Sequence, residues 1–241
     1  MFALQLAGQI AFIGASLVLG TKLLLTWRRT REAAELGIGL AFLLGGGVGY
    51  LAWLGLAVAG SLGTPPTQLA PVMLLGLLAT CTGAIANGIG IAKIFRPGAR
   101  WTAPVLGVLA LFMAATVVAT VALPPERATN AFWAGLLAII PIYAWAAGEA
   151  FALASTLNRR ARIGLADPIV MHRIFQWGVS GAIVVAMTGL SFAGRLAYGP
   201  VLPPWVSALN AALGMGSALV VWLGFFPPGP IRERLARAYA S

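Results

Sequence analysis

Charged residues are scarce in this chain. They make up 9% of its 241 residues, while 60% of the residues are hydrophobic; a soluble domain carries about 25% charged residues. A water-soluble fold of this size could not bury so much apolar surface, so the composition excludes a soluble domain. The apolar residues come in long runs rather than in alternation, which argues against a wide β-barrel. Helices satisfy their own backbone hydrogen bonds in lipid, so we predict an all-α, polytopic membrane protein.

Residues that carry out chemistry are also few. The single cysteine, Cys81, excludes an intrachain disulfide and a cysteine metal cluster, and the single histidine, His172, excludes bis-histidine haem and a histidine-rich metal site. The last apolar run has no lysine to hold a retinal Schiff base, and the sequence has no phosphate-binding glycine loop followed by Lys-Ser/Thr. We therefore expect no enzyme activity, no metal and no cofactor.

Seven apolar runs are long enough to cross a bilayer, since one crossing takes roughly 20 residues. The predicted spans cover about 3–26, 34–60, 69–95, 103–124, 131–157, 169–195 and 204–226. Together they predict one bundle over residues 1–228. Residues 229–241 then form a short amphipathic tail helix on the inner membrane face, because Ile231, Leu235 and Tyr239 recur four residues apart with arginines between them.

The net charge of +10 is distributed unevenly between the ends of these runs. Of the 16 basic residues, all but Arg127 and Arg195 flank alternate connections or lie in the tail. This positive-inside pattern predicts an outside N-terminus and a cytoplasmic C-terminus in a plasma membrane, of the bacterial inner-membrane kind. Because the basic residues form short groups rather than one soluble patch, we expect no nucleic-acid partner.

Two groups of arginines define a predicted cytoplasmic basic face. They are Arg28, Arg29 and Arg31 after the first run, and Arg159, Arg160 and Arg162 after the fifth. Such a face favours anionic lipids and could also bind an acidic cytoplasmic protein.

The same arginines form part of a faint internal repeat. Each of the second three lies 131 residues after its counterpart in the first three, and Phe95, Pro97 and Gly98 match Phe226, Pro228 and Gly229 at that spacing. The pattern suggests a 3+1+3 arrangement of two parallel units with the fourth span as a linker. Positive-inside loops are basic in any case, so chance similarity is the alternative.

Glu149 is the one acidic residue well inside an apolar run. A charge at that depth costs about 2.5–3.5 kcal/mol, so we expect Glu149 to face the bundle, either protonated or paired with Lys22, Lys93 or an inner-face arginine. It is then either a ligand-binding or switch residue, or a structural pair between helices. Pro141 in the same run predicts a kink, because it cannot donate to the carbonyl of Leu137.

Neutral polar and aromatic residues inside the runs suggest a second candidate site. Most of them belong to the predicted outer half, with Tyr143 near the middle, and they could line an outward-opening cavity for a small ligand. The candidates are Gln9, Tyr50, Trp53, Asn87, Tyr143, Trp145 and Asn210. The alternative is interhelical hydrogen bonds of roughly 0.6 kcal/mol each. Glycines at Gly45–Gly47 and at Gly83 predict close helix packing.

Three functions remain open. The first is a receptor-like or sensor module that binds a small, largely apolar ligand in the bundle and acts through a cytoplasmic partner. The second is a small-solute or proton-coupled transporter, and the third is a non-catalytic accessory subunit of a membrane complex. The seven-span plan is similar to receptor-type and opsin-type bundles and to seven-helix sugar carriers, but in architecture only, which does not imply function.

Overall fold

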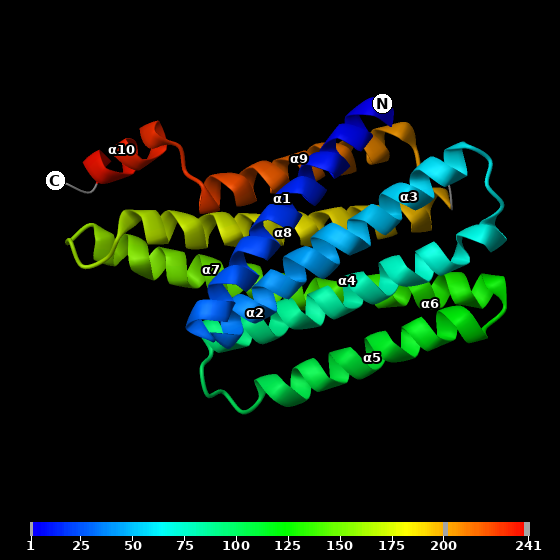
Figure 1. Ribbon diagram of the computed structural model, residues 1–241, viewed down its shortest axis with the longest axis horizontal. Helices are drawn as coiled ribbons and strands as arrows, with labels where there is room; N and C mark the ends of the chain where they lie inside the picture. The colour runs from blue at the N-terminus through cyan, green and yellow to red at the C-terminus, as the bar shows by residue number, and fades with distance from the viewer. Residues whose placement is uncertain (1, 200–201, 239–241) are drawn as a thin grey trace.

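The computed structural model describes residues 2–199 and 202–238, and every regular element in that part of the chain is helical (Figure 1). The elements are α1 (Phe2–Thr30), α2 (Ala33–Leu40), η1 (Ala41–Gly49), α3 (Tyr50–Ser61), α4 (Pro66–Phe95), α5 (Thr102–Ala122), α6 (Pro125–Leu137), α7 (Ile139–Ala161), α8 (Pro168–Tyr198), α9 (Pro204–Phe225) and α10 (Gly229–Ala238).

Seven helical spans in the described residues are long and apolar enough to cross a membrane. This confirms the predicted number of spans, and most boundaries agree within about four residues. The fifth span is the exception, because its helix begins at Pro125 rather than near residue 131. The sixth span starts as expected, with the Asp167 carboxylate accepting a 2.7 Å hydrogen bond from the Ile169 N–H and with Pro168 in the first helical position.

The fifth span is broken at Ala138, where α6 ends and α7 begins. Pro141 has no N–H for the carbonyl of Leu137, its partner in a continuous helix, and its ring would clash with that carbonyl. The helix is therefore interrupted one turn before the proline, close to where a kink is predicted.

The second span contains a π-helical segment, η1, which was not predicted. It covers AFLLGGGVG and joins α2 to α3 without a loop. Four of its nine residues are glycines. A π-helical turn inserts one extra residue and re-aims the following side chains, which here include Tyr50 and Trp53.

Small residues bring the second and third spans close together. A Cβ added to Gly83 of α4 would lie 2.6 Å from the backbone nitrogen of Gly45 in η1, closer than real side chains approach. A Cβ on Gly37 of α2 would lie 2.6 Å from the carbonyl oxygen of Ala86. The predicted close packing of Gly83 against Gly45 is confirmed, because a side chain at Gly83 would collide with the facing backbone.

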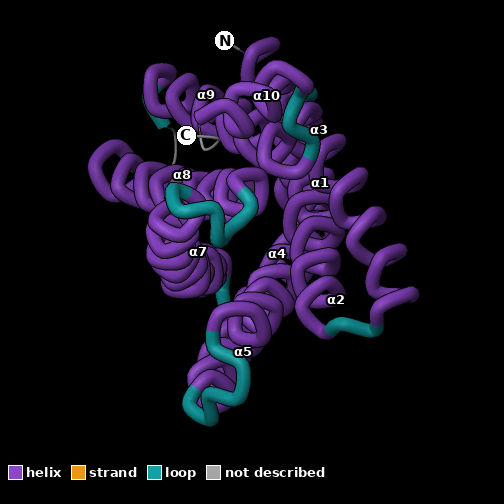
Figure 2. Tube along the Cα trace, turned by 90° about the vertical axis from the view of Figure 1, so that its left-hand side faces the viewer, coloured by secondary structure: helices purple, strands orange, loops and turns teal. Residues whose placement is uncertain are grey.

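Six spans form a closed ring, and one lies outside it. α1 packs on α9 and on the second span; the second span packs on α4, α4 on α7, α7 on α8, and α8 on α9. Among the described residues α5 contacts only α4 and α6. Figures 1 and 2 both show α5 at the edge of the molecule.

The tail forms the predicted helix, α10, which contacts α8. It lies at the end of the bundle that also holds the α7–α8 loop, away from the N-terminus (Figure 1). Tyr239, which completes the predicted apolar stripe, lies outside the described residues.

Candidate functional site

A cavity of about 440 Å³ lies inside the ring, toward the end that holds the N-terminus of α1. We call it the central cavity. Its lining residues come from all six spans of the ring and none from α5: Gln9, Phe12, Gly45, Gly46, Tyr50, Trp53, Thr80, Phe132, Trp133, Leu136, Ile139, Tyr143, Val184, Met187, Thr188, Ser191, Leu202, Ser207 and Asn210. Its volume falls within the range of about 300–1,000 Å³ typical of small-molecule sites.

The central cavity brings together most of the residues predicted to line an outer-half pocket. Gln9, Tyr50, Trp53, Tyr143 and Asn210 all contribute to its wall. They come from the first, second, fifth and seventh spans, so their proximity depends on the ring closing.

Asn87, another candidate, lines a smaller inner cavity instead. This cavity measures about 50 Å³ and shares Phe12, Gly46, Tyr143 and Val184 with the central cavity. It therefore continues the central cavity toward the middle of the bundle. A water molecule needs only about 10–15 Å³ of such space, so the inner cavity has room for water beside the Asn87 amide.

Aromatic rings form much of the wall of the central cavity. The rings of Phe12 and Tyr50 lie 4.6 Å apart between centroids and are tilted by 52°, and Phe132 meets Trp53 edge-on at 5.4 Å and Trp133 edge-on at 5.6 Å. Rings in these arrangements hold one another in place beyond the effect of their burial. The cavity therefore has a fixed, mainly apolar surface.

Several polar groups in the wall are already bonded within the protein. The Thr80 hydroxyl donates to the carbonyl of Gly76 at 2.7 Å, and the Thr188 hydroxyl to that of Val184 at 2.9 Å. The Trp53 indole N–H in turn donates to the Thr80 oxygen at 3.3 Å. These bonds satisfy three of the polar side chains that line the cavity, Trp53, Thr80 and Thr188.

The Asn210 carboxamide differs from these groups. Its Nδ2 donates to the Ser191 hydroxyl at 2.9 Å, while its buried Oδ1 has no hydrogen-bond partner among the described residues. An unpaired buried acceptor costs about 1–3 kcal/mol. Because Oδ1 is shielded from solvent, the carboxamide has to turn toward the cavity before a ligand hydroxyl or amide N–H can reach it and recover that cost.

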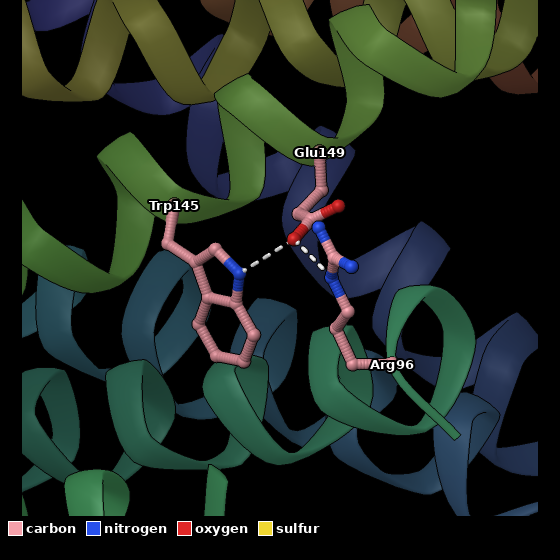
Figure 3. Close-up of polar contacts among 3 residues, drawn as sticks. All are labelled: Arg96, Trp145 and Glu149. Carbon is pink, nitrogen blue, oxygen red and sulfur yellow. Dashed lines mark hydrogen bonds and ion pairs between the residues drawn. The ribbon is translucent and has the colours of Figure 1, made fainter. Parts of the chain in front are cut away.

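Glu149 and Trp145 do not line either of these cavities. Glu149 Oε1 accepts hydrogen bonds from Arg96 Nε at 2.7 Å and from Trp145 Nε1 at 3.1 Å (Figure 3). Its side chain is 15% exposed and that of Arg96 is 52% exposed. The structure thus pairs Glu149 with Arg96, one of the arginines of the predicted inner face, not with Lys22 or Lys93, and joins α7 to the C-terminal end of α4.

Helix geometry explains why the two aromatic candidates of the fifth span face different surroundings. Tyr143 and Trp145 are two residues apart, so their side chains point about 200° apart around α7. Tyr143 faces the cavities, whereas Trp145 faces Glu149 one turn later and Trp101 at 5.5 Å between ring centroids.

The predicted basic face is exposed. Arg28, Arg29 and Arg31 lie at the end of α1, and Arg159, Arg160 and Arg162 at the end of α7, with all six side chains solvent-accessible. Figure 1 places both helix ends away from the N-terminus. The central cavity and the basic face thus lie toward opposite ends of the bundle.

Several lining residues were not among the predicted ones, notably Phe12, Phe132, Trp133 and Ser191. The adjacent Phe132 and Trp133, close to Asn130, carried a signal that could have been read, since aromatic and polar residues at one end of a span often face a cavity. Ser191 gave no such signal, because its role comes from contact with Asn210 on another helix.

These features define a class: a multi-pass helical membrane protein with a largely apolar cavity between six of its spans. The chain matches no protein-family model, no curated protein and no solved structure. Its function therefore has to be argued from this geometry.

Proposed function

We propose that the chain is a receptor-like or sensor module that binds a small, largely apolar ligand in the central cavity. The observation that carries the proposal is the cavity itself: about 440 Å³ walled by aromatic rings, with the Asn210 Oδ1 acceptor left unpaired. Pockets of this kind bind ligands by apolar burial and orient them through a few polar contacts. The same proposal assigns the chain no catalytic reaction.

The proposed orientation places the central cavity on the outer side of the plasma membrane and the basic face in the cytoplasm, following the positive-inside rule. The ligand would then reach the cavity from outside, and the exposed arginines of α1 and α7 would meet anionic lipids or an acidic protein partner. The ring of six spans connects the two ends.

A transporter is the second candidate, and one observation favours it. The cavity is lined by the first three and last three spans, while α5, the fourth, stays outside the ring. A 3+1+3 duplication with a linker helix would give this arrangement. Proton coupling through Glu149 is disfavoured, because its carboxylate is paired with Arg96 and lies outside the central cavity.

Binding of an uncharged, environment-sensitive fluorescent dye to the protein in lipid nanodiscs tests the first proposal, with empty nanodiscs as the blank. Thr188→Phe adds a ring to the cavity wall and should weaken saturable dye binding at least about tenfold. Val108→Phe adds the same ring to α5, where Val108 is 66% exposed and lines none of the cavities, and should change nothing. Equal dye binding by both variants would refute a ligand site in the cavity.

Solute flux into proteoliposomes separates sensor from transporter. Flux that depends on a pH gradient and disappears in Glu149→Gln would establish proton-coupled transport. Absence of flux for the dye that binds, together with a co-purifying cytoplasmic protein, would support the sensor.

A further inference from the structure

A second hollow lies on the side of the bundle next to the central cavity. It measures about 520 Å³ and is lined by Asn130, Trp133, Ala134, Leu137, Phe192, Arg195, Leu196 and Gly199, from α6 and the C-terminal end of α8. We call it the lateral crevice. Trp133 lines both the crevice and the central cavity, so this residue lies between them.

The broken fifth span accounts for this crevice. α7 packs along α8, whereas α6, beyond the break at Ala138, packs mainly against α5 and touches α8 only slightly. The two helices that form the crevice therefore diverge toward the end that holds the N-terminus of α1. A straight fifth helix would keep α6 close to α8 and close the gap.

Arg195 gives the crevice its chemistry. Arg195 and Arg127 are the two basic residues that neither flank the basic connections nor lie in the tail. The Arg195 guanidinium lies over the Trp133 ring, 4.9 Å from the centroid, and it forms no ion pair with any described carboxylate. A half-buried guanidinium held against an aromatic ring keeps its five N–H donors available for an anion.

Arg195 lies in the last turn of α8, the part of a spanning helix that meets the headgroup region of a bilayer. α8 ends three residues later at Tyr198, whose ring meets Trp205 of α9 edge-on at 6.2 Å. Both rings are more than half exposed, as expected for aromatic residues at a membrane–water interface. The rest of the crevice is largely apolar, and Trp133 is the residue that it shares with the central cavity.

We propose that the lateral crevice admits a single-chain amphiphile with an anionic head, such as a fatty-acid-like carboxylate, from the outer leaflet into the central cavity. Arg195 binds the head, Trp133 acts as the gate, and the apolar tail lies among the rings of the cavity. The inference rests on the proposed ligand-binding function and adds the chemical class of the ligand and its route. The inference depends on two observations together: the charge of Arg195 and the position of Trp133 in the lining of both the crevice and the central cavity.

The test uses the full chain in nanodiscs of zwitterionic lipid, with a fluorescent polyene fatty acid and its methyl ester as probes. The acid should bind about tenfold more tightly than the ester, a ratio that corresponds to about 1.4 kcal/mol. Arg195→Gln should abolish this preference and leave ester affinity unchanged. Arg127→Gln, which removes an exposed charge near the start of α6, should keep the preference.

The route is tested by kinetics. Ala134 lines the crevice but not the central cavity, so Ala134→Trp should slow the binding of both probes at least about fivefold while affecting affinity less. An unchanged rate in a folded Ala134→Trp variant would refute lateral access. A two-chain anionic lipid that competes as well as the acid would refute the single-chain assignment.

Thr188→Phe keeps this inference separable from the proposed function. If that variant loses both probes but Arg195→Gln retains the preference for the acid, the cavity stands and the role of Arg195 is wrong. If Thr188→Phe binds both probes as well as the wild type does, the proposed function itself fails.

Discussion

The contact between η1 and α4 makes a specific prediction about stability. Replacing Gly83 with alanine places a Cβ 2.6 Å from the Gly45 nitrogen and 2.9 Å from its Cα, where ordinary contact begins at 3.4 Å. The obstructing atoms are backbone, so the two helices must separate by about 0.8 Å. Overpacking of this kind costs about 1–3 kcal/mol, which exceeds the gain of roughly 0.5–1 kcal/mol from alanine in a helix.

Gly107→Ala on α5 is the matched control. A Cβ there meets nothing within 4 Å, so this variant gains helix propensity without a clash and should be as stable as the wild type or slightly more so. The difference between the two variants therefore isolates the contact between the spans.

Cys81 provides the assay. It is the only cysteine in the chain and is 5% exposed, so a fluorogenic maleimide reacts with it only as the bundle unfolds. The melting temperature should fall in Gly83→Ala by roughly 2–4 °C for each kcal/mol lost. If Gly83→Ala melts at or above the temperature of Gly107→Ala, the close approach of η1 and α4 is not as described.

Three other predictions follow from single features. Glu149→Leu should lower the free energy of unfolding by about 1.5–3 kcal/mol, toward the lower end because Arg96 is half exposed. Glu149→Gln should lose less stability, since its side-chain oxygen can still accept hydrogen bonds from Arg96 and Trp145. Equal losses for the two variants in thermal melts would contradict the pairing. Asp167→Ala should lower the free energy of unfolding by about 0.5–2 kcal/mol in the same assay, whereas Asp167→Asn should keep the cap. An alanine variant as stable as the wild type would mean that the cap does not contribute to stability. Tags at the two chain ends should be accessible from opposite sides of the membrane, because the number of spans is odd; accessibility from one side would refute the orientation.

Span number and approximate span position were predictable because hydropathy alone determines them. The kink near Pro141 and the cap at Asp167 were also predictable, since each depends on a local backbone rule. The π-helical segment was not. Its glycines predicted close packing, but the register of its hydrogen bonds is set by contacts with α4, which are far away in the sequence.

The candidate site was predictable only in part, because its residues come together through contacts between helices that are distant in the sequence. Residue type and depth identified Gln9, Tyr50, Trp53 and Asn210, because polar groups inside a span seldom face lipid. Which side of a helix faces the cavity depends on how the neighbouring helices pack. That is why Trp145 was grouped with Tyr143 although it faces Glu149, and why Phe132 and Trp133 were overlooked.

The break at Ala138 divides the fifth span between two sets of neighbours. α6 packs mainly on α5 and α7 packs mainly on α8, so α6 can tilt about this joint without sliding α7 along α8. Such a tilt would leave the Arg96–Glu149 contact intact. In the proposed sensor, a change in the width of the crevice would therefore reach the arginines through movement of α7 or α8 as a whole.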